Sequence, residues 1–488
     1  MGLRIYNTLS GKKEDFVPVE EGKVKMYVCG MTVYSDAHLG HARTYIAFDI
    51  IRRYLEYKGY KVTYVQNITD VDDKIIRSAR EKGMDPLEYS RYYTERCLSD
   101  LSALGIREAD IYPKASEHID DMIEMIQKII ENGYGYVSDG DVYFSVDRFA
   151  DYGKLSKQRI EDMKAGARIE PSEKKRNPLD FALWKSAKPD EPKWKSPWGE
   201  GRPGWHIECS AMSIKYLGVP FDIHGGGRDL IFPHHENEIA QAEAAYGKGF
   251  ARYWLHTGLL KIRGEKMSKS LGNIISVREA IKKYNPEAIR FFFASTHYRS
   301  PPNFTEEAIE HARRSLEKIY RIYDILGYFE RKGGEEEDEE VNSLVEELKK
   351  EFEEAMDDDF NTPMALKAIF RFIDRLNNKI KVSGMGSRSS KLARETLLKL
   401  CNVLTLLQDV KEEEINMDEV VGLLEKYGIE KRIRSPEEGI DALIELRDSA
   451  RRERDWVKAD SIREDLRRLG LEVEDTKMGT IWYRKRKL

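Results

Sequence analysis

A strand–helix–strand pattern near the N-terminus constrains the fold of this chain more than any other sequence feature. Residues 23–29 (KVKMYVC) read as a short buried strand, and residues 41–58 carry apolar side chains four positions apart, which indicates a helix. Residues 61–68 (KVTYVQNI) are rich in β-branched and aromatic residues and read as a second strand. Because the connections are short, this is a βαβ unit, which implies a parallel sheet.

The same pattern recurs later, with a strand at 221–224, a helix at 233–246 and a strand at 253–257. We therefore expect an α/β fold, in which a doubly wound, Rossmann-like parallel-sheet domain is split by an insertion and followed by all-α domains. The C-terminal segment 442–469 reads as one long charged helix. The expected boundaries are 1–115 for the first half of the sheet domain, 116–202 for the insertion, 203–275 for the second half, 276–332 for a helical region, 341–409 for a helical bundle and 410–488 for a C-terminal domain.

Composition limits the class of protein. The 488 residues are 41% hydrophobic, enough for several cores, and the net charge of −5 excludes a globally basic nucleic-acid coat protein but not a local basic face. The four cysteines form no CxxC pair and are too few for a disulfide framework. No apolar run approaches 18 residues, and the first ten residues lack the apolar core of a signal peptide, so we expect a cytoplasmic protein without a membrane partner.

The motif His38-Leu39-Gly40-His41 opens the first predicted helix. Ligands of open parallel sheets bind beyond the carboxyl ends of the strands, at helix N-termini. Two imidazoles there could bind a phosphate, and Gly40 would let a flat group such as an adenine approach the backbone. Taken alone, the motif could also be a helix start with surface histidines.

The run Lys266-Met267-Ser268-Lys269-Ser270 follows the last predicted strand. Two lysines and two hydroxyls on a flexible loop suit a mobile clamp on polyphosphate, although alone the run could be a solvated loop. The two motifs together, in this order and at these places in a split sheet, are improbable by chance.

In these two motifs the chain resembles the class I aminoacyl-tRNA synthetases. The resemblance implies a HUP-type catalytic domain that forms an aminoacyl-adenylate, with His38 and His41 steadying the α-phosphate in the transition state. It also implies that Lys266 and above all Lys269 stabilise the departing pyrophosphate. The implied ATP-binding residues are His38, Gly40, His41, Lys266, Ser268 and Lys269, and Mg²⁺ is expected with the ATP.

Cysteines and histidines also gather in the sheet segments. Cys29 ends the first strand, Cys209 lies in the segment WHIEC, and His234 and Glu238 share a face of a predicted helix because they are four residues apart. Two thiolates, an imidazole and a carboxylate can complete a tetrahedral zinc site. Either cysteine alone could instead be a small buried apolar residue.

Longer segments are similar to the cysteinyl-tRNA synthetase family. They are residues 26–76, WHIECSAM at 205–212, HGGGRDLIFPHHENEIAQAEA at 224–244, DDDFNTP at 357–363 and KADSIR at 458–463. The family's zinc ligands match Cys29, Cys209, His234 and Glu238, which implies one Zn²⁺ per chain. The metal would select cysteine over serine, since zinc binds a thiolate strongly and an alcohol poorly, whereas pocket shape separates them weakly.

The resemblance also implies the residues that bind the amino acid. Trp205 would contact the substrate side chain, Thr69 and Gly30 would line its pocket, and Asp229 would pair with the α-ammonium group. Asp229 could instead be a turn or helix-cap residue of its glycine-rich segment. His206, His224 and His256 could orient the metal ligands or be satisfied core residues.

The C-terminal part is the expected RNA-binding region. Residues 447–468 carry eight cations and six acids, which alone would read as a solvated, salt-bridged helix. The basic residues 484–487 follow Trp482 and Tyr483, and aromatic side chains beside cations suit stacking on unpaired bases. The resemblance implies that 276–332 contacts the tRNA stem and that 410–488 binds the anticodon.

We therefore expect a monomeric ligase that charges tRNA(Cys) with L-cysteine at the expense of ATP and binds no DNA. One alternative is a ligase that joins cysteine to a non-RNA amine such as an aminosugar, for which a long C-terminal half is not needed. A non-catalytic RNA-binding relative would be expected to have degraded nucleotide motifs, and a different class I synthetase would not explain the four zinc ligands.

Overall fold

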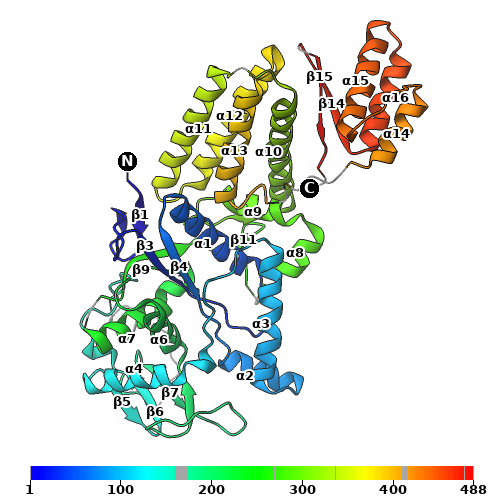
Figure 1. The fold of residues 1–488 in the computed structure, drawn as a ribbon. Helices are drawn as coiled ribbons and strands as arrows, with labels where there is room; N and C mark the ends of the chain where they lie inside the picture. Colours follow the sequence, from blue (N-terminus) through cyan, green and yellow to red (C-terminus); the bar gives the residue numbers. More distant parts are fainter. Residues whose placement is uncertain are drawn as a thin grey trace. The chain divides into compact units, whose positions relative to one another are not determined.

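The computed structural model describes residues 2–159, 174–247, 249–268, 271–335, 337–408, 410, 415–477 and 479–486. The chain folds into two compact units (Figure 1). The N-terminal unit consists of Met1–Ile309 and Met356–Thr362, and the C-terminal unit of Glu310–Ala355 and Pro363–Leu488.

A parallel sheet forms the centre of the N-terminal unit, as predicted. Its strands are β3 (Lys23–Val28), β4 (Lys61–Gln66), β9 (Phe221–Gly227) and β10 (Ala251–Thr257). They lie in the order β10-β9-β3-β4, and every pairing is parallel. Helix α1 (Leu39–Tyr57) joins β3 to β4, and α7 (Glu236–Tyr246) lies between β9 and β10 in the chain. The expected α/β fold is confirmed.

The winding of the sheet reverses between its two central strands. From β3 the chain crosses through α1 to β4 on one side, and from β9 it crosses through α7 to β10 on the other. Val28, the last residue of β3, lies opposite Gly225 of β9. Ligands of open α/β sheets bind beyond the carboxyl ends of the strands at such a reversal. The segments that follow β3 and β9 are therefore the expected place for a site.

A second, antiparallel sheet lies in the insertion and was not predicted. Its strands, in the order β5-β6-β7-β8, are β5 (Gly135–Ser138), β6 (Asp141–Phe144), β7 (Phe181–Ser186) and β8 (Gly201–Pro203). The Asp139-Gly140 turn between β5 and β6 was an available hairpin signal. The strands are short, however, and a Lys-, Pro- and Trp-rich sequence separates β6, β7 and β8, so no alternating pattern is long enough to detect. Phe144 and Trp184 anchor this sheet in the same apolar cluster as α7 and the helices α4 (Ile119–Glu131) and α6 (Trp205–Leu217).

The N-terminal unit contains further helices and short strands. The helices are α2 (Asp73–Lys82), α3 (Pro86–Ala103), α4 (Ile119–Glu131), α6 (Trp205–Leu217), α8 (Val277–Lys283) and α9 (Pro286–Ala294). The strands are β1 (Arg4–Asn7), β2 (Lys12–Asp15), β11 (Lys261–Ile262), β12 (Glu265–Lys266) and β13 (Asn303–Phe304). Helix α10 (Glu306–Lys332) leads into the C-terminal unit.

The C-terminal unit is helical, with one hairpin. Its elements are α11 (Glu339–Asp357), α12 (Thr362–Ser383), α13 (Ser387–Val403), α14 (Met417–Lys426), α15 (Pro436–Arg452), α16 (Trp456–Arg468), β14 (Leu471–Thr476) and β15 (Gly479–Arg484). Among the described residues, no helix is both long and apolar enough to cross a membrane.

The prediction of one long helix over 442–469 is wrong. The chain breaks between α15 and α16, where Arg454 adopts a positive φ of 64°. Asp455 then caps α16, because its carboxylate accepts a hydrogen bond from the backbone nitrogen of Lys458 at 3.1 Å. Because Asp455 stands among many other charged residues, its role as a helix cap is not evident from the sequence.

Candidate active site and metal centre

The two histidines of the HLGH motif form the N-terminal cap of α1. The backbone nitrogen of His41 donates to Nδ1 of His38 at 3.2 Å, and that of His38 donates to Nδ1 of His41 at 3.3 Å. The rings stack with centroids 3.6 Å apart. Burial and the neighbouring His38 lower the pKa of His41 well below its ordinary value. Because Nδ1 is an acceptor in both rings, each neutral imidazole carries its proton on Nε2 at a helix end that favours anions.

The β11–β12 hairpin brings the start of the KMSKS motif to α1. A methyl group added at Gly40 would lie 2.9 Å from Cε of Met267, so the two predicted nucleotide motifs are in contact. The backbone nitrogen of Leu39 donates to the carbonyl of Ile275 at 3.0 Å, which ties α1 to the far end of the same loop. Lys269 lies outside the described residues.

A cavity of about 370 Å³ connects these motifs to the carboxyl ends of β3 and β9. The sequence-predicted residues that line it are Cys29, Gly30, His38, Gly40, His41, Trp205, Asp229, Lys266 and Ser268. Its volume is that of an ordinary small-molecule site. Thr69 is not among the lining residues; it is buried, and its Oγ1 accepts a hydrogen bond from Nδ2 of Asn67 at 3.2 Å.

The four predicted zinc ligands lie together, each offering one donor atom within 4.8 Å of the others. The Sγ atoms of Cys29 and Cys209 are 3.7 Å apart, and Nε2 of His234 is 3.1 Å from Oε1 of Glu238. In a tetrahedral site with Zn–S bonds of about 2.3 Å, two thiolates are about 3.8 Å apart. All four side chains are buried. The donor set and its spacing therefore fit a zinc ion.

Burial controls protonation in this cluster. It raises the pKa of Cys29 well above its ordinary value, as does the neighbouring Cys209, and it also raises the pKa of Cys209. Burial lowers the pKa of His234 well below its ordinary value, so the imidazole is neutral and able to ligate. A divalent cation would supply the positive charge that buried thiolates need.

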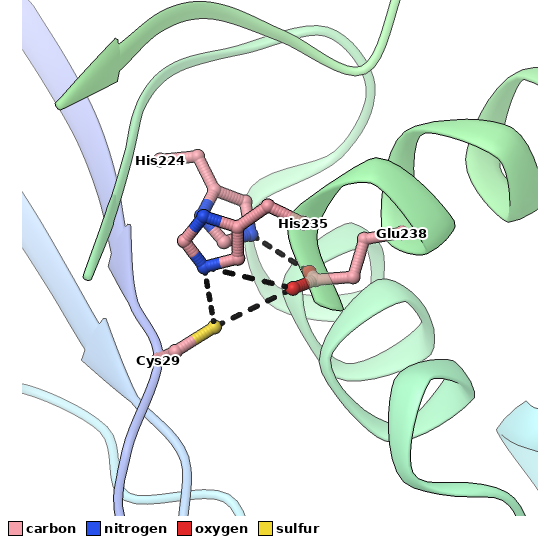
Figure 2. A group of neighbouring side chains, drawn as sticks. All are labelled: Cys29, His224, His235 and Glu238. Atoms are coloured by element: carbon pink, nitrogen blue, oxygen red, sulfur yellow. Dashed lines mark hydrogen bonds and ion pairs between the residues drawn. The ribbon is translucent and has the colours of Figure 1, made fainter. Parts of the chain in front are cut away.

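A second group shares Cys29 and Glu238 with this set and adds His224 and His235 (Figure 2). Nε2 of His224 is 2.8 Å from Oε2 of Glu238, and Nε2 of His235 is 3.3 Å from Sγ of Cys29. Since zinc favours sulfur ligands, we favour the set with two cysteines and regard His224 and His235 as groups that orient it.

His206 and His256 contact the histidines of the cluster and are not in either group of four. Nδ1 of His206 is 2.9 Å from Nδ1 of His234, so the Nε2 atom of His234 is left to face Glu238. His256 places Nε2 2.8 Å from Nδ1 of His235. The indole of Trp205 stacks on His234 with ring centroids 4.2 Å apart, and it also lines the cavity.

Sequence reasoning missed two residues of this site. His235 was passed over in favour of its neighbour, although it is three residues before Glu238 and therefore near the same helix face. Asn67 follows β4 directly, and its Oδ1 accepts the backbone N–H of Gly30 at 2.7 Å and lies 3.6 Å from Sγ of Cys209. Its position at a strand end was the available signal.

Three family models match separate parts of the chain. Residues 15–314 match the tRNA synthetases class I (C) catalytic domain, residues 351–408 the DALR domain, and residues 436–482 the cysteinyl-tRNA ligase anticodon binding domain. The cysteine–tRNA ligase of Thermococcus gammatolerans is 52% identical over 99% of both chains. That of Caldicellulosiruptor saccharolyticus is 49% identical over 98% of this chain and 99% of its own.

Solved structures show the same fold at low sequence identity. A methionyl-tRNA synthetase of Mycobacterium tuberculosis with methionyl-adenylate has a TM-score of 0.59 and 17% identity, and the match covers 78% of this chain and 89% of that one. A leucyl-tRNA synthetase of Agrobacterium radiobacter has a TM-score of 0.59 and 13% identity over 80% and 84% of the two chains. These similarities establish the class I synthetase fold.

Proposed function

The chain belongs to the cysteine–tRNA ligase family, and we propose that it activates L-cysteine with ATP and transfers the cysteinyl group to the 3′-terminal adenosine of tRNA(Cys). The observation that carries this proposal is one shared cavity: the α1 histidines and Lys266 line it together with Cys29 and Trp205. A nucleotide and a thiol-bearing amino acid can therefore meet there. The aminosugar ligase alternative is not supported, because the chain also matches an anticodon binding domain that such an enzyme does not need.

For the amino acid, we propose that Cys29, Cys209, His234 and Glu238 hold one Zn²⁺. When bound, zinc supplies a site that takes sulfur in preference to oxygen. Trp205 and Gly30 border the substrate side chain, and the carboxylate of Asp229 binds the α-ammonium group. Thr69 accepts a hydrogen bond from Asn67, whose side chain in turn binds the backbone of Gly30 at the edge of the pocket.

For the nucleotide, the Nε2–H groups of His38 and His41 donate hydrogen bonds to the α-phosphate as the cysteine carboxylate attacks it. Gly40 lets the adenine approach the helix backbone, and Ser268 binds the phosphates. Lys266 and Lys269 stabilise the pyrophosphate as it leaves, with Mg²⁺ bound to the ATP. A ribose hydroxyl of the tRNA then attacks the adenylate.

Cysteine-dependent and serine-dependent ATP–pyrophosphate exchange test the proposed function. We expect exchange with cysteine and less than about one hundredth of it with serine, since a site that binds one group specifically rejects its isostere by far more than shape does. Prolonged treatment with a zinc chelator should abolish the cysteine reaction, and added Zn²⁺ should restore it. Chelator-resistant exchange, or equal exchange with serine, would contradict zinc selection.

For the RNA, we propose that 276–332 contacts the tRNA stem and 410–488 binds the anticodon, in a monomeric enzyme. The expectation that Trp482 stacks on bases is wrong: it is 3% exposed, and its indole N–H donates to Asp441 at 3.1 Å. Trp456 at the start of α16 is 55% exposed, with the guanidinium of Arg451 5.9 Å from its ring centre. An exposed indole beside a cation suits an unpaired base.

Replacing Trp456 with alanine should lower kcat/KM for tRNA by about 5- to 150-fold, because stacking on one base contributes roughly 1–3 kcal/mol. Adenylate formation should not change. The matched control is Val457→Ala, since Val457 is the adjacent residue and is 83% exposed but has no ring. Equal charging by the two variants would exclude a stacking role for Trp456.

A further inference from the structure

Arg43 follows the HLGH motif by two residues, and its side chain leaves the cavity for the loop after α9. It is 2% exposed. Nη1 donates to the carbonyl of Phe293 at 3.0 Å. Nη2 lies within hydrogen-bonding distance of three further carbonyls, those of Thr296 at 3.2 Å, His297 at 2.7 Å and Ser300 at 3.4 Å.

The chemistry of this contact is specific to arginine. Within the part of the chain that the structure describes, Arg43 forms no ion pair, and its charge instead faces carbonyl oxygens at the C-terminal end of α9, the negative end of the helix dipole. The planar fork of a guanidinium can reach several carbonyls from one position. A lysine ammonium has three N–H donors, but they share one nitrogen atom and cannot span the same set of carbonyls.

The loop that Arg43 holds, residues 295–302, supports the β11–β12 hairpin, which ends at Lys266, the first residue of the KMSKS motif. The backbone nitrogen of Gly258 donates to the carbonyl of Tyr298 at 2.8 Å, and that of Lys261 donates to the carbonyl of Pro302 at 2.9 Å. The loop continues into β13, which pairs with β11 of the hairpin. Loop 295–302 therefore connects Arg43 to the β11–β12 hairpin.

A buried carboxylate holds the same loop. Asp359, which is fully buried, accepts hydrogen bonds from the hydroxyl of Tyr298 at 2.8 Å and from Nε of Arg299 at 2.7 Å. It also accepts the backbone N–H of Tyr6 at 2.8 Å. The loop is thus fixed through both its backbone carbonyls and its side chains.

We propose that Arg43 is a positioning residue for adenylate formation, which sets the β11–β12 hairpin against the α1 histidines by holding loop 295–302. Arg43 contacts no cavity-lining side chain in these bonds and acts through the end of α9 and the loop that follows it. The proposal rests on the proposed function, because it assumes that the α1 histidines and the hairpin act on the same ATP. A displacement of about 1 Å in such a pair can cost about 100-fold in rate.

The test compares Arg43→Lys with Arg52→Lys in the full-length protein. Arg52 is the control, since it lies on the same helix and is also buried. It donates to the carbonyl of Glu108 at 2.7 Å and to the carboxylate of Asp110 at 2.6 Å, and it does not touch loop 295–302. The measurements are the single-turnover rate constant of adenylate formation at saturating cysteine and ATP, corrected by active-site titration, and the Kd for cysteine. We expect R43K to lower the rate constant about 10- to 100-fold and to leave the cysteine Kd within about 2-fold, whereas R52K changes neither.

A double variant separates positioning from general destabilisation. In a Lys266→Ala background, R43K should cost much less than in the unaltered protein, because the hairpin's contribution is already lost. The proposal is overturned if the rate losses of R43K and Lys266→Ala simply multiply in the double variant. It is also overturned if the R43K rate constant stays within about 2-fold of the unaltered one, or if R43K and R52K lose equally. If R43K does not fold, Asp359→Asn must show the same loss of rate and the same non-additivity. If the unaltered protein forms no adenylate with cysteine, the proposed function fails instead.

Discussion

Replacing Cys209 with alanine is expected to empty the metal centre and to lower cysteine-dependent ATP–pyrophosphate exchange by more than about 100-fold. Even the loss of an outer partner of a metal ligand costs about 10- to 100-fold in affinity, and Cys209 is one of the proposed direct ligands. Cys29 would then remain as a buried thiol with a raised pKa and no cation to ionise it. Metal content per chain and the exchange rate are the two measurements.

Cys97→Ala is the matched control for this experiment. Cys97 is also buried in the N-terminal unit, but its thiol donates to the carbonyl of Ser35 at 3.4 Å and is not in the cluster. We expect C97A to keep both its zinc and its exchange activity. If C209A did the same, the proposed ligand set would be wrong, and the group with His224 and His235 would become the candidate.

Replacing His41 with asparagine should lower the rate constant of adenylate formation by about 100- to 1,000-fold, the range for loss of one transition-state donor. Asparagine can still accept the backbone N–H of His38 in place of Nδ1, so the cap of α1 is kept, but it has nothing at the position of Nε2. Single-turnover quench experiments give the rate constant, and equilibrium binding gives the Kd for ATP, which should change only slightly.

His41→Gln is the companion variant, because its amide nitrogen can reach the position of Nε2 while the acceptor at Nδ1 is lost. We expect H41Q to be faster than H41N if the Nε2–H donor matters in the transition state. The reverse order would assign the loss to the helix cap, and equal losses in ATP binding and rate would indicate uniform binding instead.

The central fold could be predicted from sequence because its signals are local. The buried strands and helix α1 show in the spacing of apolar residues, and the predicted strand at 61–68 differs from β4 only at its end. The antiparallel sheet of the insertion was missed, although the Asp139-Gly140 turn signals the β5–β6 hairpin. The rest of the sheet had no local signal, because β8 has only three residues and β7 and β8 pair across long connections. The break before α16 depended on one capping aspartate within a charged run.

In the candidate site, too, some features could be predicted from the sequence and others could not. Cys29, Cys209, His234 and Glu238 could be proposed together because their residue types and a family resemblance selected them. Sequence alone did not indicate that Trp482 would be buried, because burial depends on which elements pack against it. Arg43 was not recognised for a related reason: its partners are backbone carbonyls some 250 residues away, and carbonyls carry no side-chain signature.

By itself, the sequence determined the class of fold and the two nucleotide motifs, since each depends on residue type and short-range spacing. It also indicated the four proposed metal ligands, through their residue types and the family resemblance. Only the tertiary structure decided that Met267 lies against Gly40, that Oε1 of Glu238 faces His234 while Oε2 faces His224, and that loop 295–302 joins α1 to the hairpin. These are distances between segments far apart in the chain. They are set by how the strands pair and the helices pack, which no local pattern specifies.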